Sequence, residues 1–288
     1  ETAETEEEFK KSWHFVRENF GVIAEAENGI QRFRDLILNF AVTGKLTERN
    51  FKDTPTLEII EDTLQVKREL AKSKPIRKTK SLFPSEDLIE IDFPVKGWVS
   101  VPLGMLCFLL VDGSHNPPPK QENGIPMLSG QNVRDGYITF NASRFITEKD
   151  YLKEKSRTPI QEGDVFLSIV GSIGRSAVVP NDFPKCALQR SIALIRTKIN
   201  SYYLSLFLRS GIAFEYYLKY GKGTAQKGIY LNKLSELMIP VPPLEEQKRI
   251  VKKVDELMEL CDRVEENLSK KEELASAISA SIIHHLEL

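Results

Sequence analysis

Cysteine, histidine and long hydrophobic runs are scarce in this sequence, and each scarcity excludes a class of protein. The 288 residues include only 3 cysteines and 4 histidines. The cysteines lie far apart in apolar surroundings, which predicts neither a disulfide framework nor a zinc site and fits a reducing, cytoplasmic compartment. The longest apolar run, residues 101–111, is shorter than the roughly 18 residues that a membrane span needs. The acidic start has no signal-peptide core, and the missing initial methionine indicates a lost start residue or leader.

The common catalytic motifs are missing as well. No GxxxxGK[ST] segment predicts a phosphate-binding loop, no serine or cysteine lies in a nucleophile-elbow context, and the histidines have no metal-ligand spacing. Residues 116–119, Asn-Pro-Pro-Pro, are similar to the Asn-Pro-Pro-aromatic motif of amino-methyltransferases. Proline replaces the aromatic residue, however, and no glycine-rich methyl-donor site precedes the motif, so a polyproline turn is favoured. We therefore expect no catalytic residue, metal site or cofactor in this chain.

Acidic and basic side chains are balanced overall but unevenly distributed. The formal net charge is -1, yet residues 96–240 carry 18 basic and 11 acidic side chains, about +7, between two mildly acidic flanks. A basic segment of this kind points modestly to a polyanionic partner.

The chain divides into three parts, which predicts a mixed α/β class. Residues 1–94 contain three expected helices, over 6–20 with Gly21 as the stop, over 26–42, and from Thr54–Pro55 into the basic run 67–80. That run is interpreted as a solvated linker, with a nucleic-acid or subunit-binding surface as the alternative. Residues 95–240 form a strand-rich domain with one helix, 201–220; the expected strands are 98–103, 136–141, 163–170, 176–180 and 191–197.

Residues 241–288 predict a long coiled-coil helix. Pro242 and Pro243 suit its first turn, and no glycine or proline follows them. Its apolar seam is predicted to be a dimer or subunit interface, made by Ile250, Val254, Leu257, Cys261, Val264, Leu268, Ile278 and Ile282. Lys271 interrupts the seam and is expected near a partner's Glu265 or Glu266, or at the solvated edge. An antiparallel homodimer is expected; the alternative is a helix packed on its own domain.

Four polar, glycine-containing loops in the middle domain carry groups suited to DNA. Glutamine and asparagine pair bidentately with adenine, and arginine or lysine with guanine. The base-reading candidates are Gln131, Asn132, Arg175 and Gln226. The full set of candidate DNA-binding residues is Ser114, His115, Lys120, Ser129, Gln131, Asn132, Arg134, Ser172, Arg175, Gln189, Arg190, Lys222, Thr224, Gln226 and Lys227. Each loop alone is typical of an ordinary turn, whereas four such loops in one basic domain favour a DNA-binding surface.

Several segments that occur in a fixed order carry a family resemblance. They are LILNFAVTGKLT (36–47), FPVKGWVSVPLGML (93–106), DGSHNPP (112–118), IPMLSGQNVRDGYI (125–138), EGDVFLSIVGSIGRSAVV (162–179), ALQRSIALIR (187–196) and GTAQKGIYLNKLSELMIPVPPLEEQKRIV (223–251). Together they resemble the specificity subunit of type I restriction–modification systems, over nearly the whole chain.

This resemblance implies a non-catalytic clamp that reads DNA. In that family two target-recognition domains each read one half of a bipartite sequence in double-stranded DNA, and long helices hold them apart. The helices dock modification (methyltransferase) subunits, and restriction subunits join the assembly; S-adenosylmethionine, ATP and Mg are expected in these partners and none in this chain. The present sequence has a single recognition domain, so it is either a natural half-sized subunit or half of a longer chain.

Two other classes of function stay open at this stage. A coiled-coil adaptor with a protein-binding middle domain is the main alternative, and a free-standing methyltransferase is the other. A protein that binds DNA phosphates must lose DNA affinity steeply as salt increases. A salt titration of duplex binding therefore distinguishes a DNA reader from a protein-binding adaptor. Methyl-donor binding to the isolated chain tests the second.

Overall fold

The chain folds into two units, each with its own packing. A computed structural model describes residues 6–73, 95–141, 143–223 and 227–286. One unit is Leu38–Lys252, and the other combines Glu1–Ile37 with Lys253–Leu288. Among the described residues all strands belong to the first unit, whereas helices occur in both. The mixed α/β class predicted from the sequence is thereby confirmed.

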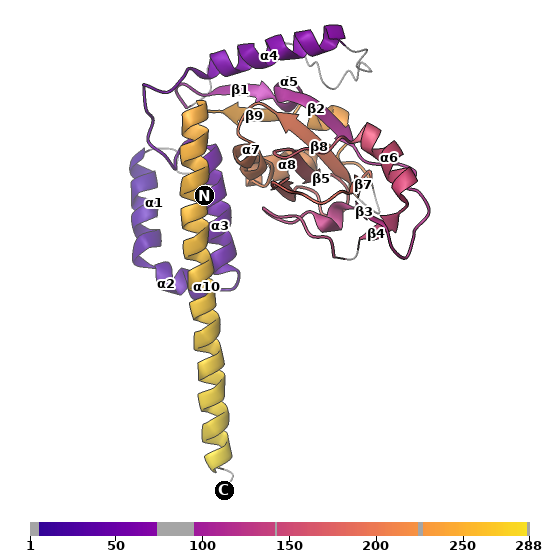
Figure 1. Cartoon of the computed structure of the whole chain (residues 1–288). Coiled ribbons are helices and arrows are strands. Elements are labelled where there is room, and N and C mark those ends of the chain that lie inside the picture. The colour runs from indigo at the N-terminus through magenta and orange to yellow at the C-terminus, as the bar shows by residue number, and fades with distance from the viewer. Residues whose placement is uncertain (1–5, 74–94, 142, 224–226, 287–288) are drawn as a thin grey trace. The chain divides into compact units, whose positions relative to one another are not determined.

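The strands of the first unit form three sheets (Figure 1). The four-stranded sheet is antiparallel throughout, in the order β2 (Cys107–Asp112), β8 (Ile192–Thr197), β5 (Val165–Ser168), β6 (Ser176–Val178). The three-stranded sheet has the order β4 (Arg144–Ile146), β3 (Ile125–Leu128), β7 (Ala187–Leu188), with β3 and β7 parallel. The two-stranded sheet pairs β1 (Val99–Pro102) with β9 (Met238–Val241). This last pairing joins the two ends of the strand-rich segment.

A hydrophobic core lies between these strands, and a buried carboxylate of the same unit forms an ion pair. Phe166, Leu188 and Leu194 are fully buried in the main cluster of this core. Asp164 has a side chain with no exposed surface and accepts hydrogen bonds from Arg196 Nε at 2.7 Å and Nη2 at 2.9 Å. A buried carboxylate needs such a partner, because an unpaired charge away from water is strongly destabilising.

The helix predicted over 201–220 is two helices, α7 (Ser201–Leu208) and α8 (Gly211–Tyr220). Ser210 has extended backbone angles, and its hydroxyl accepts from the Ala213 amide, so it caps a new helix. A serine–glycine pair inside an apolar run is the signal that the prediction overlooked. The other helices of this unit are α4 (Thr56–Ser73), α5 (Leu103–Leu106), α6 (Glu148–Arg157), α9 (Leu231–Leu234) and the 3₁₀ turn η3 (Gly130–Asn132).

Two sequence-based boundaries also need correction. The run 136–141 forms no named strand; its one bridge joins Val133 and Ile138, because its backbone is used in a tight loop. Helix α4 continues to Ser73, so the first half of the basic run 67–80 is helical, and the second half lies outside the described residues.

The second unit is helical: it contains α1 (Glu6–Glu18), α2 (Phe20–Glu25), the part of α3 (Gly29–Val42) up to Ile37, and α10 from Lys253 onward. The first break comes at Asn19 and not at Gly21, which lies inside α2. The Asn19 side chain donates to the carbonyl oxygen of Phe15 at 2.9 Å, so it competes with the helical ladder at that point.

Helix α10 runs from Leu244 to Leu286. The two prolines precede it, and the Pro243 carbonyl oxygen accepts the first helical hydrogen bond, from Gln247. Among the described helices, none combines the length and apolar character needed to cross a membrane.

Candidate nucleic-acid interface

Hydrogen bonds link the four predicted loops, either directly or through residues 188–191. We name them loop A (112–121), loop B (129–136), loop C (171–176) and loop D (220–228). Loop A meets the segment after β7, where the Ser114 amide donates to Leu188 O at 2.8 Å and the Arg190 amide donates to Ser114 O at 3.0 Å. Loop B meets the next residue of that segment, through the Gly130 amide and the Ser191 hydroxyl at 2.9 Å.

Loops B, C and D are connected in the same way. The Gly136 amide of loop B donates to Ser176 O of loop C at 2.9 Å. The Gly171 amide of loop C donates to Lys227 O of loop D at 3.1 Å. Loops B, C and the described part of loop D are thereby direct neighbours, and loop A is linked to loop B through residues 188–191.

Most candidate side chains reach solvent. Those that are exposed are His115, Lys120, Gln131, Ser172, Arg190, Lys222 and Lys227, and those that are half-buried are Ser129, Arg134, Arg175 and Gln189. Thr224 and Gln226 lie outside the described residues. The exposed cations suit phosphate contacts, and the glutamine and arginine side chains of loops B and C suit base edges.

Asn132 is not placed to read a base. Its side chain has no exposed surface, and its amide nitrogen donates to the carbonyl oxygens of Thr139 and Asn141 at 3.0 and 2.9 Å. Its side-chain oxygen accepts from the Ser129 amide at 2.9 Å. The carboxamide is therefore used inside the protein, and we withdraw Asn132 from the base-reading candidates.

Ser114 and His115 are also engaged by the protein. Ser114 is buried, and its hydroxyl donates to Glu154 Oε1 at 3.0 Å. His115 stays exposed, with Nε2 lying 2.6 Å from Asp112 Oδ2, and Asp112 also accepts from Arg157 at 2.8 Å. Ser114 is therefore a structural residue of loop A, whereas His115 keeps its other ring nitrogen for a ligand.

A hollow of about 320 Å³ opens beside loop B. Two predicted residues line it, Gln131 and Arg134, together with Tyr137, Thr139 and Asn141, which the prediction missed. A signal for the missed residues exists, because they alternate with Ile138 and Phe140, and both of these pack on the main core cluster. Period-two alternation places the three polar residues on the opposite side of the chain.

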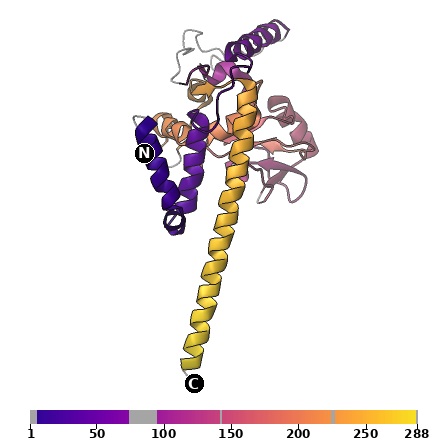
Figure 2. The same cartoon turned by 90° about the vertical axis from the view of Figure 1, so that its left-hand side faces the viewer.

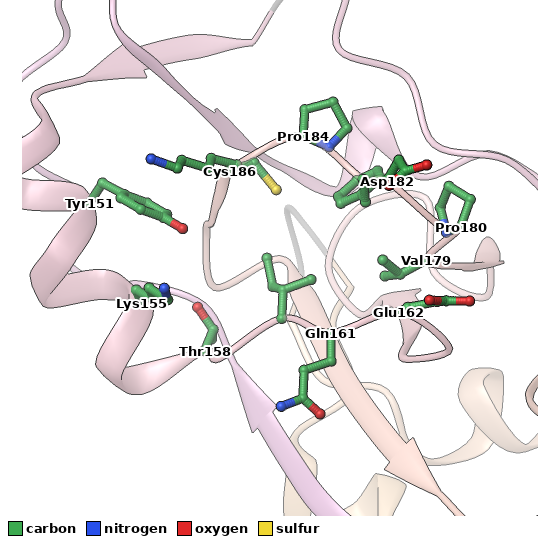
Figure 3. A pocket seen from close by; sticks show the side chains of 13 residues that line it. Tyr151, Lys155, Thr158, Gln161, Glu162, Val179, Pro180, Asp182, Pro184 and Cys186 are labelled. Atoms are coloured by element: carbon green, nitrogen blue, oxygen red, sulfur yellow. The ribbon is translucent and has the colours of Figure 1, made fainter.

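A second hollow, of about 300 Å³, lies between α6 and the segment before β7. Figure 3 shows Tyr151 and Lys155 of α6 on one side of it, and Val179 and Pro180 on the other. Cys186 also lines it, but burial raises the pKa of its thiol to about 12. Since the thiolate is the nucleophilic form, Cys186 is inert near neutral pH.

The first turn of α10 is held to other segments of the first unit by the side chains of Glu246 and Gln247. Gln247 is fully buried; its oxygen accepts from the Asn200 amide at 2.8 Å, and its nitrogen donates to Pro242 O at 2.8 Å. Glu246 is buried beside it and accepts from the Thr47 hydroxyl at 3.4 Å. Burial raises the pKa of the Glu246 carboxyl. These buried side chains fix the first turn of α10.

The predicted coiled-coil seam is largely satisfied by the chain itself. Ile250 and Val254 are buried and Leu257 is half-buried. Farther along α10, Cys261, Val264 and Leu268 pack against Ala24 of α2 and against α3, through Ile30, Phe33 and Ile37. Figures 1 and 2 both show α3 alongside α10. This part of the seam is therefore an internal contact and not a surface for a second chain.

Lys271 is likewise paired within the chain. Its Nζ lies 2.7 Å from Glu25 Oε1 of α2, and not beside Glu265 or Glu266 of a partner. Its side chain is 68% exposed, which agrees with the predicted alternative of a solvated edge. Beyond Lys271 the apolar residues stay exposed, with 63% of Leu274 and 55% each of Ile278 and Ile282 accessible. The last turns of α10 extend past α1 to α3 (Figures 1 and 2), so the seam is uncovered there among the described residues.

Comparisons with known proteins agree with the motifs. A family model, "Type I restriction modification DNA specificity domain", matches residues 97–274. The chain is 24% identical over 266 residues to the type I restriction enzyme EcoAI specificity subunit of Escherichia coli, covering 90% of this chain and 45% of that protein. It is 26% identical over 257 residues to the EcoBI specificity subunit of Escherichia coli, covering 88% and 49%. The chain thus spans about half the length of these curated relatives.

Solved structures include similar chains. The HsdS subunit from Thermoanaerobacter tengcongensis superposes with a TM-score of 0.45 at 19% identity, covering 81% of this chain and 62% of that one. A chain from a structure of the type I R-M system gives a TM-score of 0.48 at 21% identity, covering 76% and 53%. Because the family model spans more than half of the sequence, from residue 97 to residue 274, this chain belongs to the type I restriction–modification DNA specificity domain family, with one recognition domain.

Proposed function

We propose that this chain is the non-catalytic component of a type I restriction–modification complex that reads a short half-site in double-stranded DNA. Loops A to D contact the DNA, with lysine and arginine on phosphates and amide, hydroxyl and guanidinium groups on base edges. The observation that carries the proposal concerns polar loops that are distant in sequence and lie in a segment of charge about +7. Loops B, C and D are hydrogen-bonded to one another in series, and loops A and B both bond to residues 188–191.

The chemistry of the complex is assigned to partner subunits. Modification subunits would bind S-adenosylmethionine and methylate DNA, and restriction subunits would use ATP and Mg; this chain docks both kinds. The family membership supports this division, since the matched relatives are named specificity subunits. A preparation free of partners should show no methylation, cleavage or ATP hydrolysis, and any of these activities would contradict the assignment.

A second copy of the chain is the proposed occupant of the exposed end of α10. Leu274, Ile278 and Ile282 are four residues apart, so they form one stripe along the helix. Burying a large aliphatic side chain contributes roughly 1.5–3 kcal/mol, so an uncovered stripe favours association. A two-fold dimer reads two inverted copies of one half-site. The alternative occupant is the other half of a longer chain, since the relatives are about twice as long.

A salt titration of duplex binding tests the DNA proposal. Neutralised phosphates release counterions, so the logarithm of the binding constant must fall linearly with the logarithm of the salt concentration. Between about 50 and 200 mM salt, a protein with several phosphate contacts loses affinity by roughly 10³-fold or more. Binding that does not change over this range would overturn the proposal.

An adaptor function is the second candidate, and helix α8 supplies an observation in its favour. Ile212, Phe214 and Leu218 are between 43% and 50% exposed, which is typical of a protein contact. Replacing Phe214 and Leu218 with aspartate should release a protein partner under that function. The same variant should bind duplex DNA as the unmodified chain does if α8 serves only for subunit docking.

A further inference from the structure

The hollow beside loop B is built around the buried side chain of Asn132. Its amide nitrogen lies within 3.0 Å of Thr139 O and Asn141 O and 3.3 Å from the Ser143 hydroxyl. Its oxygen accepts from the Ser129 amide at 2.9 Å. One fully buried carboxamide therefore ties η3 to the chain segment 139–143. A satisfied buried amide rigidifies the segments that it joins.

The turn between these two segments is equally constrained. The Arg134 amide donates to Tyr137 O at 2.9 Å, and the Thr139 amide donates to Asn132 O at 2.9 Å. Gly136 has φ of 92°, a conformation that side-chain-bearing residues rarely adopt, and its amide is held by Ser176 O. The walls of the hollow are thus fixed by the backbone before any ligand arrives.

The lining residues point into solvent for a reason visible in the packing. Ile138 and Phe140 pack on the core cluster, which leaves Tyr137, Thr139 and Asn141 on the other side of the segment. Tyr137 is 62% exposed, a large exposure for an aromatic residue in a held turn. An exposed aromatic ring on a turn with a fixed backbone is typical of surfaces that stack or pack against a ligand.

The chemistry of the hollow fits the edge of a purine. Its five lining residues supply two carboxamides, one guanidinium, one aliphatic hydroxyl and one phenol, and none of them is a carboxylate. Carboxamides pair bidentately with adenine N6 and N7, and guanidinium with guanine O6 and N7. A site for phosphate alone would need cations, and Arg134 is the one cation among these five residues.

We propose that this hollow reads one purine of the half-site, that Tyr137, Thr139 and Asn141 determine specificity there, and that Asn132 is the positioning residue that holds them. The inference rests on the proposed DNA-reading function and deepens it by naming the reading site. The sequence suggested that Asn132 contacts a base directly. In this proposal Asn132 acts instead by positioning the residues that contact the base.

Selection from a pool of randomised DNA duplexes tests the proposal with the full chain. Asn141→Ala and Tyr137→Ala change exposed side chains and should keep the fold. Asn141→Ala should lower the preference for the favoured base at one or two positions of the selected sequence by about 5- to 150-fold, the effect of losing one bidentate base contact. Tyr137→Ala removes at most a single hydrogen bond to a base and should lower the preference at the same positions by about 2- to 13-fold. Preferences at the other positions should stay unchanged. Asn232→Ala, an exposed asparagine of α9, is the matched control and should change nothing.

The positioning role needs a separate readout. Asn132→Asp keeps the side-chain shape but replaces the amide donor with an oxygen, so it should lose preference at the same positions as Asn141→Ala. The double variant should lose no more than the single variants, because both act on one contact. If Asn132→Asp does not fold, Ser143→Ala removes one of the groups that the Asn132 amide contacts and should weaken the same preference partially.

The selection experiment distinguishes failure of the DNA-reading function from failure of the proposed reading site. If the unmodified chain selects no sequence, the proposed function fails. If it selects a sequence but Asn141→Ala and Tyr137→Ala leave every position unchanged, the function stands and the reading site is elsewhere. If both variants weaken binding to all sequences equally, the hollow contacts the DNA backbone, and the purine assignment is overturned.

Discussion

Asp53 and Arg249 form a two-armed ion pair at the start of α10. Arg249 Nη1 and Nη2 donate to Asp53 Oδ1 and Oδ2 at 3.0 and 2.6 Å. Only 4% of the Asp53 side chain is exposed, against 36% of Arg249. Hydrogen bonding to Asp53 raises the pKa of Arg249. The segment before α4 is thereby tied to the long helix by a contact that water screens only partly.

Asp53→Asn should reduce the free energy of unfolding by about 1.5–3 kcal/mol, the usual range for a lost hydrogen bond to a charged group. Urea denaturation followed by circular dichroism measures the change. Glu256→Gln, in the exposed Lys253–Glu256 pair at 3.4 Å, is the control and should change stability by no more than about 0.5 kcal/mol. Equal effects of the two substitutions would show that the Asp53 contact contributes nothing special.

Because of the buried amine of Lys67, we expect the free energy of unfolding to depend on pH. Its Nζ donates to Gly104 O at 2.5 Å and to Met105 O at 3.3 Å, and burial lowers its pKa from 10.5 to about 8. Between these two pKa values the unfolded chain holds more protons than the folded one, so the free energy of unfolding rises with pH there. The slope is at most about 1.4 kcal/mol per pH unit.

Lys67→Met should remove this rise between about pH 8 and pH 10.5, because it removes the titrating amine. Urea unfolding at several pH values gives the two curves, and their difference isolates the contribution of Lys67. The exposed Lys149→Met of α6 is the matched control and should run parallel to the unmodified chain. If the Lys67→Met curve also runs parallel, the amine is solvated and its pKa is ordinary.

The exposed end of α10 predicts a dimer. The double substitution Ile278→Asp with Ile282→Asp should convert dimers to monomers, as measured by light scattering at tens of micromolar. Circular dichroism should show no loss of helix content. Ala280→Asp, about 200° around the helix from Ile278, should remain dimeric. Val264→Asp should instead destabilise the helical unit, since Val264 packs against α2 and α3. A monomeric unmodified chain would contradict the proposed dimer.

Local sequence rules predicted much of the fold and less of its interfaces. Period-two alternation in residues 136–141 correctly indicates which side chains share a face. It does not reveal that no strand pairs with them, because the loop is held by distant partners such as Ser176. The same limit applies to Asn132: a polar residue between glycines can turn inward or outward, and long-range hydrogen bonds decide.

The seam of α10 shows this limit on a larger scale. The a/d spacing predicts a packed stripe, and Val264 and Leu268 are indeed packed. Spacing carries no information about whether the partner helix belongs to the same chain. Ile30 and Phe33 of α3 supply the cover here, although α3 is much shorter than α10.

Substitutions in loops C and D should separate affinity from specificity. Lys222 is exposed, and Lys222→Ala should weaken binding to all duplexes alike and reduce the salt slope by about 1, as expected for one lost phosphate contact. Arg175→Ala should lose about 1–3 kcal/mol for the preferred sequence and relax the choice at one position. Anisotropy titrations with preferred and scrambled duplexes measure both. Identical losses on the two duplexes for Arg175→Ala would remove it from the base readers.

The most direct test of the central claim is sequencing of the duplexes that the unmodified full chain selects from a random pool. The selected duplexes should share a short motif that recurs as two inverted copies around a fixed spacer, and their binding should weaken steeply as salt increases. A pool that stays random after selection, with binding insensitive to salt, would contradict the claim that this chain reads DNA.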